Sequence, residues 1–443
     1  MATPISSKRR DMTAHPIVTT LRRVFRDRTD AAMEPASLTS RRAAAMARFV
    51  ELGLPGRRDE AWRFTNLQPL TEARAAPASM AETGVDPSLL AAHRLPGTAH
   101  RIVVANGCVR PDLSVIGELP LGVWFGSVVD AIDLRPDLSD TAFDVSDTIG
   151  ARPFASLNAA LFTDGFVLAI DPGVVLTHPV EITYLGKSGA CHLRNTIRLG
   201  TGSQATVVET FAGTGETWTT AVTTIEVGDD AKLRHVKVQA EADAAIHFAL
   251  TRASLATAAS YDGFLLITGG LLSRQDIQVA MTGEAANLTL NGAWLLRGEQ
   301  EATVAPSVDH QAPGGQTNEL FKGVHGDRAH GVFLGSVMVR EGADGTNARQ
   351  LNRNLLTSPT ARVDTKPELT IHADEVKCGH GATVGDLDEA ALFYLLSRGI
   401  DPAMARHMLI EAFAAEVFDT AALAPQIDAH ARRYLNAWLG AGS

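Results

Sequence analysis

Features that define several common protein classes are scarce in this chain of 443 residues. It has three cysteines, Cys108, Cys191 and Cys378, which are too few and too scattered for a disulfide framework and fit a reducing compartment. No run approaches the about 18 consecutive apolar residues that indicate a membrane-spanning helix. The net charge of −10 argues against a dedicated nucleic-acid binder, which would carry a basic surplus. We therefore expect a cytoplasmic globular protein.

The signature motifs of common enzymes are also missing. The sequence contains neither the G-x-S-x-G motif of serine hydrolases nor the H-E-x-x-H motif of zinc proteases. Residues 186–188, Gly-Lys-Ser, resemble the end of a phosphate-binding loop, but Glu181 stands where the first glycine of that loop is required. We interpret this tripeptide as a turn between strands. The sequence offers no catalytic set of its own.

From about residue 166 the sequence consists of short Thr-, Val- and Ile-rich runs separated by polar turns. The segment that begins at Ile197 aligns with the segments that begin at Ile225 and Ala253, which gives a period near 28 residues. Each copy contains a polar turn, an alanine and a strand, with no helix between copies. This pattern predicts a β-solenoid whose small alanines turn the corners. An ordinary antiparallel sandwich is the alternative. The residues expected to line the core include Val207, Val236, Phe264, Leu288 and Phe333.

Helical patterns flank the repeat region. Residues 16–52 show a loosely amphipathic pattern that Pro35 divides into two helices. Asn106-Gly107 predicts a hairpin turn, and residues 134–152 predict a loop or linker.

Three further helices are predicted after residue 385, two of them capped by aspartate. We expect an N-terminal helical and mixed region over 1–150, a β-helix core over 151–385 and a C-terminal helical domain over 386–443. The short C-terminal helices carry apolar stripes, so they must cap the solenoid, dock a partner, or do both.

Cys378 and His380 lie two residues apart at the end of a pattern that predicts a strand. Because side chains alternate along a strand, both would leave the same face. Thiolate and imidazole are ligands suited to iron, zinc, copper and iron–sulfur chemistry. Two ligands cannot complete a tetrahedral site, so sulfide or a partner's side chains would be needed. In isolation C-x-H is a weak motif, and a packed cysteine beside a hydrogen-bonding histidine is its commoner meaning.

The remaining candidate residues have weaker signals. His310 sits beside turn residues and could be a surface or ligand histidine, whereas His325 and His330 flank a turn and are expected to be solvated. His372 is expected to have a structural role. Cys108 and Cys191 are expected to be inert, and Trp62 is expected to anchor the N-terminal segment.

The surroundings of Cys378 and His380 resemble the SufB/SufD family of iron–sulfur cluster assembly scaffolds, and are most similar to SufD. The resembling segments are 350–356, 365–369, 373–383 and 392–395, with weaker similarity at 309–310, 320–324 and 60–65. The resemblance implies a right-handed parallel β-helix core, which agrees with the repeat.

The same resemblance implies a non-catalytic scaffold that acts with a SufB-like paralogue and two copies of a SufC-like ATPase. The paralogues would pair through their terminal strands, and a transient iron–sulfur cluster bound by Cys378 and His380 would be shared across that interface. The C-terminal helices would dock the ATPase, and the isolated chain could form a homodimer. A SufB-like role is the alternative within the family. The absence of an N-terminal cysteine motif argues against it.

Two other classes remain open on the sequence. A β-helix carbohydrate-active enzyme, such as a polysaccharide lyase or hydrolase, would need clustered acids in an exposed groove, and no such cluster is evident. A purely structural β-solenoid is the third possibility. Copurification of an ATPase and a paralogue would distinguish the scaffold from both.

Overall fold

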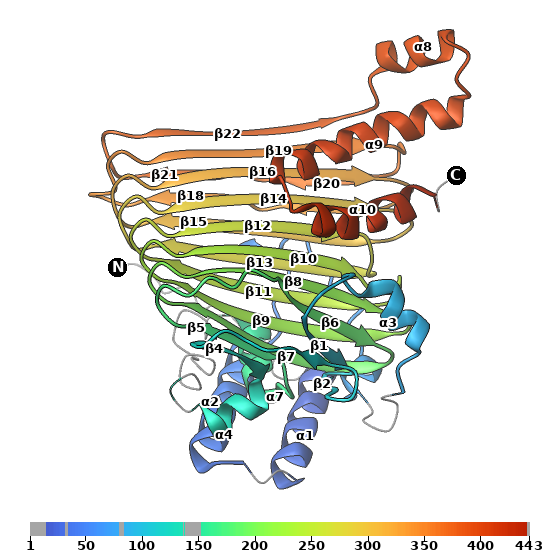
Figure 1. Cartoon of the computed structure of the whole chain (residues 1–443). Helices are drawn as coiled ribbons and strands as arrows, with labels where there is room; N and C mark the ends of the chain where they lie inside the picture. The colour runs from blue at the N-terminus through green and yellow to red at the C-terminus, as the bar shows by residue number, and fades with distance from the viewer. Residues whose placement is uncertain (1–14, 32–33, 79–83, 136, 138–151, 441–443) are drawn as a thin grey trace, which may run out of the picture.

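The computed structural model describes residues 15–31, 34–78, 84–135, 137 and 152–440. Two stacked sheets of mainly parallel strands form the centre of the molecule (Figure 1). The first sheet contains, in spatial order, β2 (Cys108–Val109), β1 (His100–Ala105), β6 (Val180–Gly186), β8 (Gln204–Gly213), β10 (Lys232–Ala240), β12 (Ser260–Ile267), β14 (Asn287–Leu296), β16 (Gln316–His325), β19 (Asn347–Leu356) and β22 (Lys377–Gly385), with β3 (Val115–Ile116) beside β1.

The second sheet faces the first across the lumen of the solenoid. It contains, in spatial order, β20 (Arg362–Thr365), β17 (His330–Phe333), β15 (Glu301–His310), β13 (Leu272–Met281), β11 (Ile246–Leu255), β9 (Thr217–Val227), β7 (Gly189–Leu199), β5 (Phe166–Ile170) and β4 (Val123–Ser127), with β18 (Ser336–Val339) beside β15 and β21 (Glu368–Ile371) beside β18. From β6 onward the chain passes alternately between the sheets, so each coil adds one level to both. The predicted parallel β-solenoid is confirmed.

Helices lie at both ends of the chain. They are α1 (Pro16–Ala31), α2 (Ala36–Leu52), α3 (Pro87–His93), α4 (Val128–Leu134), α7 (Pro153–Leu161), α8 (Glu389–Ser397), α9 (Pro402–Ala421) and α10 (Pro425–Gly440), with short 3₁₀ turns at Glu60–Trp62 and Ala73–Ala75. The predicted division of residues 16–52 at Pro35 is confirmed, with the second helix beginning directly after the proline. The predicted linker at 134–152 lies mostly outside the described residues.

The repeat period comes from a corner that recurs on every coil. Gln204, Lys232 and Ser260 stand in register on three neighbouring strands, 28 residues apart. Just before each of the latter two, the chain makes a left-handed turn, with φ of 55° at Asp230 and 53° at Ala258. The alanine that follows each turn is fully buried and points into the corner. Only a small side chain fits there, which explains the alanines at 231 and 259 and the serine at 203 in the coil before them.

The main apolar cluster between the sheets contains Val207, Leu288 and Phe333, as predicted. The prediction was wrong for Val236 and Phe264. These two residues pair with each other on the outward side of the first sheet and pack against the C-terminal helices. Both faces of this sheet are apolar because helices cover the outer one, so alternation alone cannot identify the lumen side.

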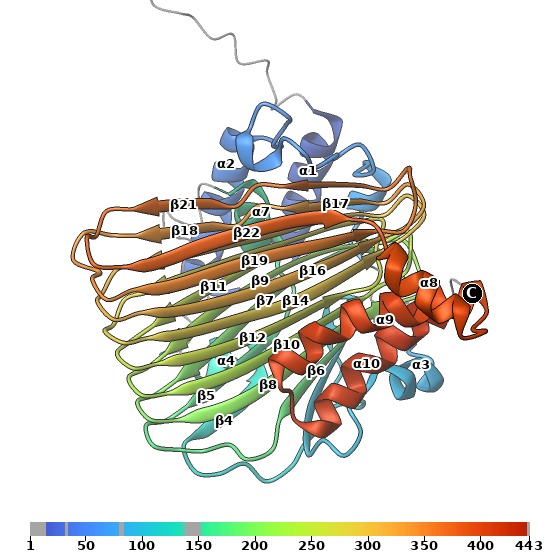
Figure 2. The ribbon, with the colours of Figure 1, turned by 90° about the horizontal axis from the view of Figure 1, so that it is seen from above.

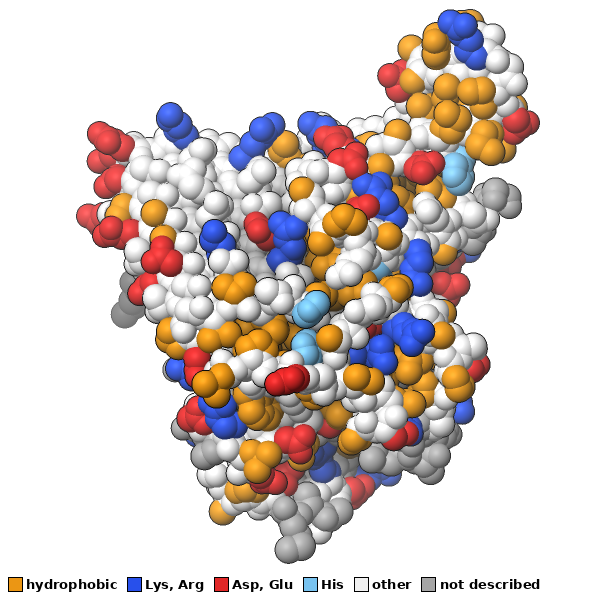
Figure 3. Space-filling view, viewed as in Figure 1, with side chains coloured by type: hydrophobic (Ala, Val, Ile, Leu, Met, Phe, Trp, Pro, Cys, Tyr) orange, Lys and Arg blue, Asp and Glu red, His pale blue; other side chains and the backbone are white. Residues whose placement is uncertain are grey.

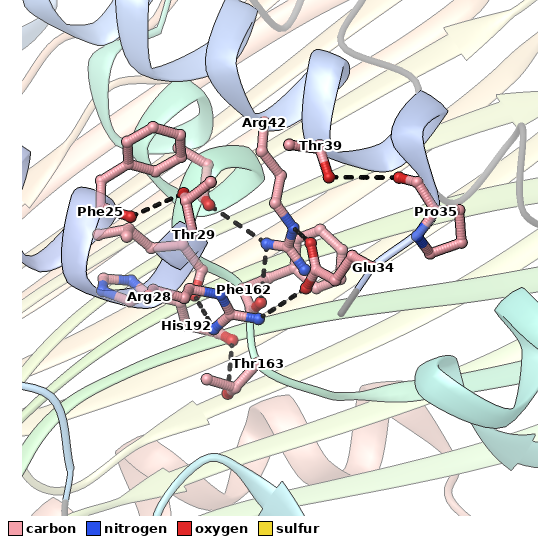
Figure 4. A network of polar contacts seen from close by, with 12 residues as sticks. Phe25, Arg28, Thr29, Glu34, Pro35, Thr39, Arg42, Phe162, Thr163 and His192 are labelled. Atoms are coloured by element: carbon pink, nitrogen blue, oxygen red, sulfur yellow. Dashed lines mark hydrogen bonds and ion pairs between the residues drawn. The ribbon is translucent and has the colours of Figure 1, made fainter. Parts of the chain in front are cut away.

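Helices α1 and α2 pack on the outer face of the second sheet through α7, whereas α3 contacts β6 and β8 of the first sheet. Arg42 of α2 is buried and forms an ion pair with Glu34 at 2.8 Å, and its guanidinium lies 3.8 Å from the centre of the Phe162 ring (Figure 4). It also donates hydrogen bonds to the carbonyl oxygens of Ala160 at 3.2 Å and Phe162 at 3.0 Å, at the C-terminal end of α7. Burial lowers the pKa of Arg42 to about 10, so the side chain stays cationic at neutral pH.

The N-terminal strands join the solenoid. The predicted hairpin forms at Asn106-Gly107, where both residues have positive φ, as a two-residue type I′ turn requires. β1 pairs with β6, and β4 pairs with β5. The division of the chain at residue 150 stays a prediction.

Candidate ligand site at the open end of the solenoid

The last strand of the first sheet, β22, has a strand neighbour on one side only among the described residues. It pairs in parallel with β19 and lies at the end of the solenoid that faces the viewer in Figure 2. The amide of Lys377 donates to the carbonyl oxygen of Thr346 at 2.8 Å. Since backbone groups alternate in direction along a parallel strand, residues 378, 380, 382 and 384 direct their backbone N–H and C=O groups to the open edge.

Cys378 and His380 lie on one face of β22. They stand in register with Ala348 and Gln350 of β19, two buried residues on the lumen side. Cys378 is half-buried in a small apolar cluster that includes Val337, and burial raises the pKa of its thiol. The ring of His380 is exposed at the end of the lumen. Sequence spacing therefore predicted the shared face correctly.

These two side chains do not make a complete metal site. Among the described residues, no group of three or more His, Cys, Asp or Glu side chains is placed to hold a metal ion. A thiolate and an imidazole at an open edge fit a site whose other ligands come from sulfide or a second chain, because a tetrahedral iron or zinc needs four donors. The donor types also fit iron–sulfur chemistry, in which histidine can replace cysteine.

The other histidines differ from the sequence-based expectations. His310 and His325 are fully buried at the ends of their strands, and burial lowers the pKa of each to about 4. His310 bonds to the hydroxyl of Thr317 at 3.0 Å and is not a surface residue. His330 is partly buried and hydrogen-bonds to Asp364 at 2.7 Å. The turn predicted between 325 and 330 is present, but the strands extend right up to it and bury its flanks.

The two remaining cysteines and Trp62 have the surroundings expected of structural residues. Cys191 is buried and its pKa is raised to about 12, so it carries almost no thiolate at neutral pH. Burial also raises the pKa of Cys108. Trp62 packs against Phe154, with ring centres 5.2 Å apart, and Arg274 stacks over the indole at 4.1 Å. The indole thus anchors the N-terminal segment to the second sheet.

Sequence reasoning missed a polar lining beneath the open end. In β19 the lumen-facing residues Gln350, Asn352 and Asn354 are all amides, and all are buried. Below them, the carboxyl group of Glu319 is fully buried in β16. The signal was the alternation of amides with other residues in 350–354. A period of two places all three amides on one face.

A second candidate surface is the projecting helix α8. None of its residues is buried, and the side chains of Phe393 and Tyr394 are 72% and 57% exposed. Met404 and Met408, in the first half of α9, add further exposed apolar area. Figure 3 shows hydrophobic side chains gathered on this lobe, which stands clear of the solenoid. Exposed apolar patches of this kind commonly mark protein-interaction sites.

The second half of α9 and helix α10 behave differently. Val417 and Phe418 of α9 and Leu435 of α10 pack on outward residues of the first sheet. Asp388 and Asp401 cap α8 and α9 by accepting backbone hydrogen bonds, as predicted. The C-terminal helices thus divide into a part that covers the solenoid and a part left free.

Comparisons with known proteins cover nearly the whole chain. Residues 183–413 match the model of the SUF system FeS cluster assembly SufBD core domain, and residues 19–182 match the SufBD protein N-terminal region. An iron–sulfur cluster assembly SufBD family protein of Synechocystis is 32% identical over 408 residues, which covers 88% of this chain and 89% of that protein.

Two proteins named iron–sulfur cluster assembly protein SufD are also similar. The Escherichia coli protein is 30% identical over 380 residues, covering 84% of this chain and 86% of the relative. The Bacillus subtilis protein is 27% identical over 402 residues, covering 87% and 90%. With the solenoid, its open end and these matches taken together, the chain belongs to the SufBD family of the SUF iron–sulfur cluster assembly system.

Proposed function

We propose that this chain is a SufD-like, non-catalytic scaffold subunit on which a transient iron–sulfur cluster is assembled. Its partners would be a SufB-like paralogue and a SufC-like ATPase that supplies the energy. The observation that carries the proposal is the placement of Cys378 and His380 on the lumen face of a terminal strand with an open edge. The carbohydrate-active alternative has no support from the family matches.

The cluster is cargo in this proposal. Cys378 would bind iron as a thiolate and His380 through a neutral ring nitrogen, while sulfide and the paralogue supply the remaining ligands. The raised pKa of Cys378 keeps the thiol protonated in the free chain. Iron binding must therefore displace that proton, which makes loading weaker at low pH.

The open edge of β22 supports pairing with another chain. An unpaired edge strand presents a row of backbone donors and acceptors, and natural proteins usually protect such edges or use them for assembly. Here the edge carries four small or flexible positions, Gly379, Gly381, Ala382 and Gly385, which leave the backbone accessible. The preferred occupant is the corresponding strand of the SufB-like paralogue. A second copy of this chain would use the same edge when the paralogue is absent.

The α8 surface supports docking of the ATPase. It lies beside the open end but not on it (Figure 1), so both partners can bind at once.

We also keep two predictions as parts of this proposal. The chain acts in the cytoplasm, and its parts divide at residues 150 and 385. The described residues contain no helix long and apolar enough to cross a membrane.

The decisive experiment replaces His380 with alanine in cells that coexpress the two partners. We expect the purified complex to keep its subunit composition and to lose most of its iron and acid-labile sulfide, because β22 keeps its backbone ladder and loses a ligand. His372→Ala is the matched control, since His372 is an exposed histidine on the same terminal coil. Equal cluster content in the His380→Ala and wild-type complexes would refute the assignment.

Cys378→Ala should give a milder loss than His380→Ala, because sulfide or a partner thiolate can take the place of one cysteine. Cys108→Ala is its control and should leave the cluster content unchanged. A Cys378→Ala complex that retains full cluster content, together with an unaffected His380→Ala complex, would move the assembly site away from this strand.

A further inference from the structure

Just below the open end, the lumen of the solenoid changes from apolar at β14 to polar at β16 and β19. The lumen residues of β14 include Leu288 and Leu290, whereas β19 places amides at positions 350, 352 and 354. The amide nitrogen of Asn354 donates to Asn352 Oδ1 at 2.7 Å, and the nitrogen of Asn352 donates to the carbonyl oxygen of Phe321 at 3.3 Å. The polar zone at this end therefore begins at β16, two strands below β22, where Glu319 is buried.

One column of side chains runs through this polar zone to the edge. Glu319, Gln350 and His380 occupy the same register position on the three consecutive strands β16, β19 and β22. Neighbouring strands lie about 4.8 Å apart and the side chains share the lumen face, so each can reach the next. Gln350 Nε2 donates to Glu319 Oε2 at 2.6 Å.

The single oxygen of the Gln350 amide accepts no hydrogen bond among the described residues. Gln350 Oε1 and Glu319 Oε1 are enclosed and lack a hydrogen-bond partner among the described residues. Leaving a buried acceptor unsatisfied is energetically unfavourable, so such groups need an explanation. The residue above Gln350 in the column is His380, whose ring carries the N–H donor that this oxygen lacks.

The opposite sheet holds the amide in place. A Cβ atom added at Gly335 would stand 2.2 Å from Gln350 Oε1 and 2.5 Å from its Cδ. Only glycine therefore leaves room for the amide between the two sheets. Glu319 fixes the amide from below and the backbone at residue 335 limits it from the side.

We propose that Glu319 and Gln350 are positioning residues that select the ring tautomer of His380. Glu319 holds the nitrogen of the Gln350 amide toward itself, which leaves Oε1 to accept the N–H of one ring nitrogen of His380. The lone pair of the other ring nitrogen is then free to bind iron. This inference rests on the proposed function, because it assigns His380 as the residue to be oriented. Metal-binding histidines generally donate their second ring N–H to such a group.

The ionisation of Glu319 bears on the orientation of the amide. A carboxylate can only accept hydrogen bonds, so it orders the Gln350 amide in one way, whereas a protonated carboxyl could donate to Oε1 and favour the reverse. Burial raises the pKa of Glu319 to about 7. The other titratable groups of this part of the lumen, His310 of β15 and His325 of β16, bond to Thr317 and Asn354 instead.

The test measures the tautomer of His380 by two-bond proton–nitrogen NMR on the full chain labelled with ¹⁵N-histidine. We expect one dominant tautomer in the wild-type chain at pH 8. Gln350→Leu and Glu319→Gln should give a mixture of both, and Asn352→Leu should not, since Asn352 is a buried amide of the same strand in register with Ala382. Equal tautomer ratios in the wild-type and Gln350→Leu chains, or a mixture in the wild type, would overturn the proposal.

A second variant guards against misfolding of the first. Gly335→Ala changes no polar group but pushes the Gln350 amide, and should produce the same mixture. In the complex, iron loading of Gln350→Leu should fall about tenfold. The two proposals fail separately: if His380→Ala leaves the cluster intact, the ligand assignment fails, while the NMR measurement still decides whether Gln350 sets the tautomer.

Discussion

Lys322 of β16 donates a hydrogen bond from its ammonium group to the carbonyl oxygen of Phe413 in α9, at a nitrogen–oxygen distance of 2.9 Å. The same ammonium pairs with Glu416 and lies 4.1 Å from the centre of the Phe413 ring. The lysine side chain is only 2% exposed, and burial lowers its pKa while Glu416 opposes that shift. This buried contact attaches α9 to the solenoid.

Replacing Lys322 with alanine should loosen α9. The variant loses buried methylene contacts, the hydrogen bond and the cation–ring contact, for an expected cost of about 1 to 2 kcal/mol. Hydrogen exchange should show faster exchange of the α9 amides by about tenfold. Arg353→Ala is the control, because Arg353 pairs with the same Glu416 at 3.3 Å but is well exposed, and such pairs contribute little. Similar exchange in both variants would contradict the assignment.

Replacing Phe393 with glutamate should weaken ATPase binding. Burying one phenylalanine side chain contributes about 2 kcal/mol, so the dissociation constant should rise at least tenfold. Isothermal titration with the purified ATPase measures this directly. Leu121→Glu, at a residue that is 97% exposed on the N-terminal side of the molecule, should have no effect. An unchanged affinity in the Phe393 variant would exclude α8 from the interface.

Replacing Ala382 with proline should block pairing at the edge of β22. Its backbone N–H points away from β19, so proline removes a donor needed by a partner strand and leaves the existing ladder intact. Analytical ultracentrifugation should show loss of the complex with the paralogue, and of any homodimer, while the circular dichroism spectrum is retained. Thr360→Pro, at an exposed turn position, would serve as a control only for general strain. A proline variant that still associates normally would show that the interface lies elsewhere.

The stability of the chain should decrease as the pH rises toward 8, through Glu319. Its folded pKa of about 7 lies above its ordinary value of 4.5, so the folded state binds the proton more tightly than the unfolded state. This contribution is fully present below about pH 4.5 and is lost as the pH rises through 7. Glu319→Gln should remove at most about 3 kcal/mol of this dependence. Melting temperatures at pH 5.5 and 8, with the exposed Glu284→Gln as control, would test it.

Much of the architecture was predictable because local rules decided it. The 28-residue spacing follows from one corner geometry, and the hairpin at Asn106-Gly107 and the cap at Asp401 follow from backbone preferences of those residues. Val236 and Phe264 were misplaced because a helix far along the chain covers the outer face that they occupy. This packing is a long-range tertiary contact, and the alternation of apolar and polar residues along a strand does not reveal it.

The candidate site was predictable only in part. The spacing of Cys378 and His380 fixed their common face, but it carried no information on what lies beneath them. Glu319 was missed because a carboxyl group on a strand is ordinarily solvated. This one is buried only because it faces the lumen between the neighbouring coils. The need for glycine at position 335 is likewise visible only in the structure, where the Gln350 side chain of the opposite sheet leaves no room for a Cβ atom.

The attachment of α9 has a mechanical consequence. Glu416 is held both by Lys322 of β16 and by Arg353 of β19, so part of any force on the projecting α8 enters the solenoid at these two strands. The lumen side of the same strands carries Glu319 and Gln350. Force applied to α8 can therefore reach the strands of the column beneath His380 through one helix, α9.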